Sequence, residues 1–198
     1  MNRKLLKRIL VTSAIAVLGV STSFAALVTE RDQSVDTAPS VGMYRYQVPT
    51  ELQGTYNSAG VANLTASMEK EPNTLSMNVA HVKGNPSESY VVEIYKDLAA
   101  IETHRKSDHY QAFVNEVGSK LTNRKMYDVQ SVLLFEKKDA LSIVNDGKAV
   151  VTLTEFTVNS NDIDTVQRQY QLDIERAVRD DAGYKAGYVL RERNVKNH

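Results

Sequence analysis

Residues 90–113, YVVEIYKDLAAIETHRKSDHYQAF, constrain the fold of this chain more than any other segment. The first six of them are all aromatic or branched at Cβ apart from one Glu, which is the composition of a half-buried strand. Side chains alternate between the two faces of a strand. The segment therefore predicts one face with Val91, Glu93 and Tyr95, and an opposite face with Tyr90, Val92 and Ile94.

A helix is expected after this strand, with a break in its middle. Asp97 can cap the first turn, because its carboxylate can accept from the free N–H groups there. Leu98 and Ile101 have the spacing of residues that face inward. Ser107 offers a second N-cap, so we expect the helix to stop and restart there, with Phe113 buried beyond the break.

Upstream and downstream patterns complete an α+β unit. We expect strands at residues 41–48, 75–82 and 128–137, and a helix at 51–70. Together with the central strand and helix, this gives the order βαββαβ within a domain at residues 41–138, the order of a ferredoxin-like fold. Such a sheet has helices on one face only, so its other face needs a partner.

The region at residues 149–198 resembles the beginning of a second copy. Residues 149–158 alternate like a strand, and a helical stripe of Ile163, Val166, Tyr170, Ile174 and Ala177 follows. A turn and a further strand then lead to residue 190. We interpret 149–198 as a βαβ half-repeat; an ordinary strand–helix–strand extension is the alternative.

The N-terminus has the pattern of a secretory signal peptide. Four basic residues precede an apolar run at residues 9–20, and Ser23 and Ala25 are small residues at the positions that a signal peptidase recognises. We expect a signal peptide at 1–25, a flexible leader at 26–40, and a periplasmic or secreted protein without a membrane segment after cleavage. An uncleaved membrane anchor is the alternative.

Charge and cysteine content narrow the possible partners. The chain of 198 residues has 24 basic and 24 acidic residues, and cleavage after Ala25 removes four basic ones, leaving 20 against 24. A mildly acidic chain without a basic stripe argues against nucleic acid as a partner. There is no cysteine, so disulfides and thiol chemistry are excluded.

These segments resemble the antibiotic biosynthesis monooxygenase superfamily of dimeric α/β barrels. The matching positions are Glu93, Tyr95, Asp97, Leu98, His104, Ser107, His109, Tyr110 and Phe113, together with the turn at residues 71–77. The resemblance covers roughly residues 41–137. It implies a homodimer that pairs two sheets into a barrel, and a ligand cavity between the sheets.

The candidate site follows from this resemblance. His109 is the expected general base and Tyr95 the expected hydrogen-bond donor to a bound small aromatic molecule. Glu93, Asn78, His104 and Phe113 are expected to contact this ligand. We expect no metal site, because the five-residue spacing of the two histidines does not put them on one helical face.

Several functions remain open on these residues. The first is an exported, cofactor-independent monooxygenase-like enzyme that acts on a quinol or a similar small aromatic. The others are a non-catalytic small-ligand protein, a haem-binding protein with His109 as axial ligand, and an isomerase of small sugar-derived signals. No cofactor is expected, although haem or flavin is compatible with the resemblance. The chain has no Trp, which several oxygenases of the superfamily place beside their substrate.

Overall fold

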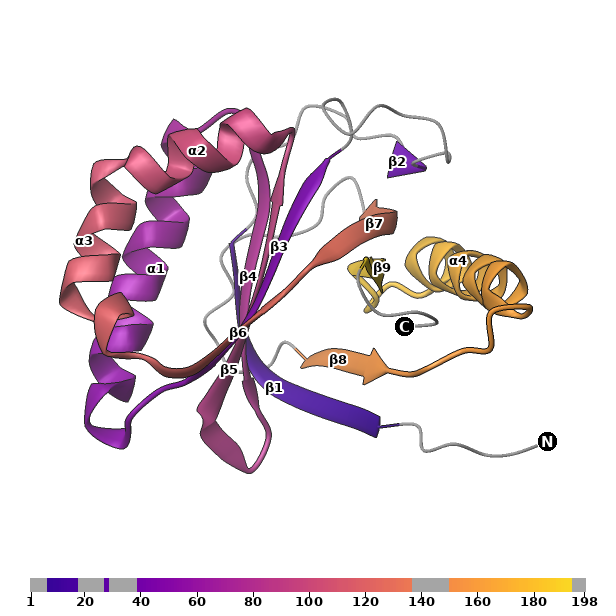
Figure 1. Ribbon diagram of the computed structural model, residues 1–198, viewed down its shortest axis with the longest axis horizontal. Helices are drawn as coiled ribbons and strands as arrows, with labels where there is room; N and C mark the ends of the chain where they lie inside the picture. The colour runs from indigo at the N-terminus through magenta and orange to yellow at the C-terminus, as the bar shows by residue number, and fades with distance from the viewer. Residues whose placement is uncertain (1–6, 18–26, 29–38, 137–149, 194–198) are drawn as a thin grey trace.

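The computed structural model describes residues 7–17, 27–28, 39–136 and 150–193 (Figure 1). Its elements are β1 Lys7–Val17, β2 Leu27–Val28, β3 Ser40–Gln47, α1 Gln53–Lys70, β4 Thr74–Val82, β5 Asn85–Tyr95, α2 Leu98–Lys106, α3 Asp108–Glu116, β6 Thr122–Tyr127, β7 Val129–Glu136, β8 Val150–Glu155, α4 Ile163–Asp180 and β9 Ala186–Glu192. Short 3-10 turns at Thr50–Leu52 and Gly118–Lys120 precede α1 and β6. Most of the leader predicted at 26–40 lies outside the described residues.

Six strands form one sheet in the order β6–β3–β5–β4–β1–β8. The four strands from β3 to β6 are antiparallel neighbours, and α1 and the α2–α3 pair are the two helical connections between them. This is the expected ferredoxin-like arrangement. Figure 1 shows the three helices together on one side of the sheet.

The break between α2 and α3 is confirmed. The Asp97 side chain accepts from the backbone N–H of Ala100 at 2.9 Å, and that of Ser107 accepts from the N–H of Tyr110 at 3.3 Å. Ser107 also ends α2, because its hydroxyl donates to the carbonyl of His104 at 2.7 Å. The prediction that Leu98 faces inward is wrong: it is 52% exposed.

The fourth strand of the unit is β6, and not residues 128–137 as predicted. β6 lies at the edge of the sheet and pairs with β3. Its sequence, TNRKMY, is mostly polar, and five of its six residues are exposed, so it has no apolar alternation to mark it as a strand. β7 instead belongs to a second sheet with the order β2–β7–β9.

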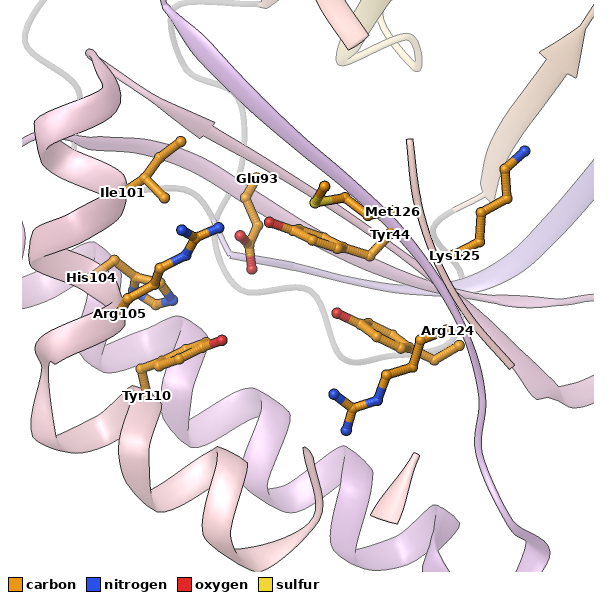
Figure 2. A pocket seen from close by; sticks show the side chains of 10 residues that line it. Tyr44, Glu93, Ile101, His104, Arg105, Tyr110, Arg124, Lys125 and Met126 are labelled. Atoms are coloured by element: carbon orange, nitrogen blue, oxygen red, sulfur yellow. The ribbon is translucent and has the colours of Figure 1, made fainter. Parts of the chain in front are cut away.

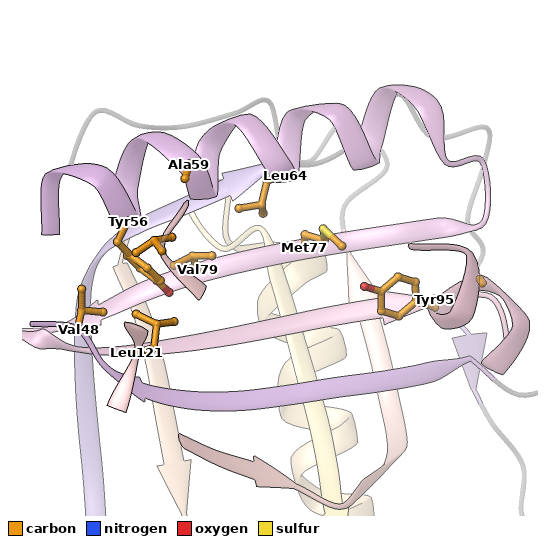
Figure 3. Close-up of a cluster of buried hydrophobic side chains, with 10 residues drawn as sticks. Val48, Tyr56, Ala59, Leu64, Met77, Val79, Tyr95 and Leu121 are labelled. Carbon is orange, nitrogen blue, oxygen red and sulfur yellow. The ribbon is translucent and has the colours of Figure 1, made fainter. Parts of the chain in front are cut away.

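The core under the helices is shown in Figure 3. Tyr56, Ala59 and Leu64 of α1 pack on Met77 and Val79 of β4, with Tyr95, Val48 and Leu121 completing the buried cluster. Tyr56 and Met77 are exposed by only 2% and 1%. Fully burying an apolar side chain of this size stabilises the folded state by about 1.5–3 kcal/mol, so this cluster fixes the helices on the sheet.

The second sheet covers part of the opposite face. Met43, Tyr90, Tyr127 and Val129 form a second buried cluster, against which Leu190 of β9 packs. Figure 1 shows β7, β9 and α4 on the side of the large sheet away from α1–α3. The C-terminal segment thus covers part of this face within one chain. A homodimer stays a prediction. Because part of the apolar face is covered within the chain, less of it is left for a second protomer to cover.

The C-terminal strand–helix–strand order is confirmed, and its two strands lie in different sheets. β8 pairs with β1, and β9 pairs with β7. In α4 the expected stripe, which includes Ile163 and Tyr170, is half-buried. Whether the segment is a half-repeat remains an interpretation.

The strand β1 overlaps the predicted signal peptide. Its backbone pairs with β4 and β8. Cleavage after Ala25 stays a prediction. Among the described residues, no helix combines the length and the apolar character that a membrane span needs.

Candidate active site

A cavity of about 250 Å³ lies between the large sheet and the helices α2 and α3. Its walls are formed by Tyr44, Tyr46, Glu93, Ile101, His104, Arg105, Tyr110, Arg124, Lys125 and Met126 (Figure 2). The cavity is therefore on the helix-covered face. This cavity is not the one expected between the paired sheets of a dimer. The second sheet of the chain packs on the other face of the large sheet.

Aromatic rings from β3 form one wall. The rings of Tyr44 and Tyr46 are stacked, with centroids 6.0 Å apart and planes 8° from parallel. They share a face because they are two residues apart on a strand. Gly42 precedes them on the same face, and a Cβ atom there would lie 2.8 Å from Cε2 of Tyr44. Gly42 thus leaves the space that this ring occupies.

Glu93 of β5 carries the carboxyl group of the cavity. It lies opposite Gly42 in the β3–β5 pairing, and the Tyr95 hydroxyl donates to its Oε2 at 3.0 Å. Burial raises the pKa of the Glu93 carboxyl to about 7, even though the Tyr95 hydrogen bond and the charge of Arg105 act in the other direction. A carboxyl group that titrates near neutral pH can serve as a general base.

Arg105 of α2 is the cation whose charge acts on this carboxyl group. Its guanidinium hydrogen-bonds Tyr44, and Nη1 lies 3.0 Å from Oε1 of Glu102 on the exposed side. Figure 2 shows Arg105 and Glu93 beside each other, with Tyr110 facing them across the cavity. A deprotonated hydroxyl group of a ligand that lies beside Glu93 would therefore be close to a positive charge.

A second polar cluster joins the end of α1 to the α2–α3 break. Glu71 accepts from Nδ1 of His104 at 3.1 Å, from Nε2 of His109 at 2.7 Å and from the Thr74 hydroxyl at 2.6 Å. Burial alone would raise the pKa of Glu71, but these hydrogen bonds and the charge of His104 together lower it. The cluster therefore holds an ionised carboxylate.

The hydrogen-bonding groups of His104 favour a hydrogen-bond network over a metal site in this cluster. Glu71, His104 and His109 offer three ligand atoms within 4.8 Å of one another, which is a set that could hold a metal ion. A metal on Nδ1 of His104 would require the proton on Nε2. That atom is buried and has no hydrogen-bond partner among the described residues. With the proton on Nδ1, the carboxylate accepts it and Nε2 is a bare acceptor, which costs less.

The structure brings two of the six predicted site residues to the cavity, Glu93 and His104. His109 binds Glu71 outside the cavity lining, and Tyr95 is buried beneath Glu93. Asn78 donates to Ser76 on the face of β4 opposite the one that carries Met77, and Phe113 packs against the core. His109 thus does not line this cavity.

Eight of the ten residues that line the cavity had no ligand role assigned from the sequence, and five of these are polar or aromatic side chains of particular interest. Tyr44 and Tyr46 could have been found, since the pairing of their strand with β5 puts them on the same face of the sheet as Glu93. Arg105 and Tyr110 lie in the helical segment of the central motif. Arg124 had no sequence signal, because the edge strand β6 was not predicted.

The strand order and the helix-covered cavity define an α+β protein of the ferredoxin-like class. Residues 40–116 match the family model of the antibiotic biosynthesis monooxygenases. This segment, from β3 to the end of α3, is an antibiotic biosynthesis monooxygenase domain. The resemblance seen in the sequence is thus confirmed. No curated protein matches the chain.

Solved structures of the same description resemble the chain. A protein from Lactobacillus acidophilus with a proposed monooxygenase activity is 21% identical over 58% of this chain and 47% of its own, with a TM-score of 0.46. Proposed antibiotic biosynthesis monooxygenases from Bacteroides thetaiotaomicron and Nitrosomonas europaea are 23% and 20% identical. They cover 44% of this chain each and 84% and 85% of their own, with TM-scores of 0.43 and 0.42. The chain spans about half the length of the Lactobacillus protein.

Proposed function

We propose that this protein is a cofactor-independent monooxygenase that acts on a small hydroxyaromatic compound such as a quinol. The observation that carries the proposal is Glu93, a carboxyl group with a pKa near 7 inside a cavity walled by tyrosine rings. Glu93 takes the proton of the ligand hydroxyl, and Arg105 stabilises the phenolate. The domain class of residues 40–116 supports this reading.

The chemistry balances without an external reductant. A hydroquinone loses a proton to Glu93, and its electron-rich ring then reacts with dioxygen. One oxygen atom forms a new C–O bond, and the other leaves as water with the two hydrogen atoms that the ring loses, so the products are a hydroxyquinone and water. The substrate supplies all the electrons, and the protein contributes orientation, deprotonation and exclusion of water.

Oxygen consumption tests this function. The protein and its Glu93→Gln variant are supplied with hydroquinones under air, and dioxygen uptake and the quinone product are measured. We expect the variant to lose about 100-fold or more in rate, the size of a general-base contribution. Glu69→Gln, at an exposed position of α1, is the control. Equal rates for wild type and Glu93→Gln would refute the assignment of Glu93.

A non-catalytic ligand-binding protein is the second candidate. It uses the same cavity, and the observation that favours it is the absence of Trp from the chain, since several oxygenases of the superfamily use one. Saturable binding of a hydroquinone without oxygen uptake above the spontaneous rate would support this candidate over the enzyme.

We further propose that the protein is exported, and that it forms the homodimer expected from the domain class of residues 40–116. The N-terminal signal pattern supports export, and N-terminal sequencing of the secreted product should begin at or near Ala26. An intact Met1 in a soluble cytoplasmic fraction would contradict export. Light scattering at micromolar concentration tests the dimer, and the mass of a single chain would contradict it.

A further inference from the structure

Arg124 is a cation of the cavity wall without a carboxylate partner among the described residues. It comes from the edge strand β6, and its Nε donates to the carbonyl of Leu121 at 3.2 Å. Its Nη2 donates to the carbonyl of Gly118, in the 3-10 turn before β6. Both acceptors are uncharged, so they hold the guanidinium in place and leave its positive charge uncompensated.

The hydrogen bonds of Arg124 leave part of the guanidinium available. This group has five N–H donors in a fixed planar fork. Two of them are used by Leu121 and Gly118, so the two donors of Nη1 have no partner among the described residues. A guanidinium that is already fixed loses little conformational entropy when it binds a ligand, and a free pair of donors suits the two oxygens of an acidic group.

The other two cations of the cavity wall already have partners. The Nζ atom of Lys125 lies 3.8 Å from the centre of the Tyr127 ring and 3.9 Å from Oε1 of Glu192. Arg105 is paired with Glu102 and Tyr44. Arg124 is therefore the cation of this wall that is left to pair with a second, acidic group of a ligand.

The two charged ends of the cavity lie apart. Figure 2 shows Glu93 and Arg105 on one side and the Arg124 guanidinium on the other, with the Tyr110 hydroxyl facing the space between them. A ligand that binds both ends must carry a hydroxyl group at one end and a negative charge at the other. The negative charge must point away from Glu93, which would repel it when ionised. A volume of about 250 Å³ accommodates a single substituted ring.

We propose that the cavity selects hydroxyaromatic compounds that carry an additional acidic group, and that Arg124 binds this group while the hydroxyl faces Glu93. This inference rests on the proposed function, because it names the substrate class of the same cavity. It assigns Arg124 as the residue that determines specificity. Neutral hydroquinones remain substrates, with weaker binding.

A matched pair of probes tests the charge preference. Binding of 2,5-dihydroxybenzoate and of its methyl ester is measured by titration calorimetry under nitrogen, with the full chain. The two compounds have the same ring and hydroxyl groups and differ in charge. We expect the acid to bind the wild type at least about tenfold more tightly than the ester. In Arg124→Gln the two should bind equally within about twofold.

Arg168→Gln is the control, since Arg168 is an exposed residue of α4. This variant removes the same charge and should keep the full preference for the acid. Loss of the preference in both variants would mean that net charge, and not Arg124, is responsible, and would overturn the proposal. Equal binding of acid and ester by the wild type, or binding of neither, would overturn it as well.

Failure of this inference is distinguishable from failure of the proposed function. The function is tested by oxygen uptake with a neutral hydroquinone, which does not need Arg124. Oxygen uptake that depends on Glu93, without any preference for the acid, would leave the function standing and refute the role of Arg124. Preference for the acid without oxygen uptake would support a binding protein for acidic aromatics.

Discussion

Nε2 of His109 lies 2.7 Å from Oε1 of Glu71, although the two residues are 38 positions apart in the chain. His104 binds the same carboxylate from the other side of the helix break. Glu71 follows the last turn of α1, so one carboxylate fastens three helices together. The two histidines meet because Ser107 redirects the chain between them.

Replacement of Glu71 by Gln should destabilise the protein. The Gln amide keeps one oxygen as an acceptor, but its NH₂ group would face the donors of His104, His109 and Thr74. The negative charge of the carboxylate is also lost. Hydrogen bonds to a charged group contribute about 1.5–3 kcal/mol, and we expect the free energy of unfolding in urea to fall by about 2–3 kcal/mol. Glu69→Gln, at an exposed position of α1, should change it by less than about 0.5 kcal/mol. Equal effects of the two changes would show that the cluster does not stabilise the fold.

Stability should decrease as the pH falls below about 6.5. Burial lowers the pKa of His104 and of His81 in the folded state. As the pH falls, the unfolded chain therefore binds these protons at a higher pH than the folded state does. The folded state loses stability once the pH drops below the pKa of histidine in the unfolded chain, and above that pH there is no effect. Urea midpoints at pH 7.5, 6.0 and 5.0 measure this. The dependence should weaken in His104→Gln; a midpoint that rises on acidification would contradict the prediction.

The pH dependence of activity should report Glu93. Its pKa of about 7 means that the base form prevails above neutral pH. With a hydroquinone as substrate, kcat/KM should rise with pH and level off above pH 7, because the free enzyme must be deprotonated. Glu93→Gln should remove this inflection. An inflection that survives in the variant would belong to another group.

Substitution of Gly42 by Ala should disturb the cavity. The new Cβ would lie 2.8 Å from Cε2 of Tyr44 and displace this ring from the wall. We expect the affinity for hydroquinone to fall about tenfold, measured by calorimetry. Gly54→Ala is the control, because nothing lies within 4 Å of its added Cβ on α1. That change should leave binding unaltered and raise stability by about 0.5–1 kcal/mol.

The sequence predicted the segments whose signals are local. The caps at Asp97 and Ser107 are hydrogen bonds within three residues, and the alternation of β5 is a property of one strand. Both therefore appear in the structure as expected. The order of the unit followed from these segments and the helix before them.

Long-range features were harder to predict. The role of Glu71 depends on a contact with His109 across two connections, and no local pattern encodes it. β6 is a strand because β3 offers it hydrogen-bonding partners, and its exposed polar side chains give no periodic signal. The cavity lined by Glu93 and His104 has walls from β3, β5, β6 and the α2–α3 pair, which meet only through long-range packing.

The position of β9 has a consequence for how the chain is made. Residues 40–127 can assemble their four strands and three helices before β9 is available, since domains generally fold as units from the N-terminal side. The apolar surface around Met43 and Tyr90 then remains exposed to water until Leu190 packs on it. During that interval the partly folded chain exposes an apolar patch that favours aggregation. A general chaperone that shields such surfaces should therefore raise the yield of soluble protein, and chains that stop before β9 should aggregate.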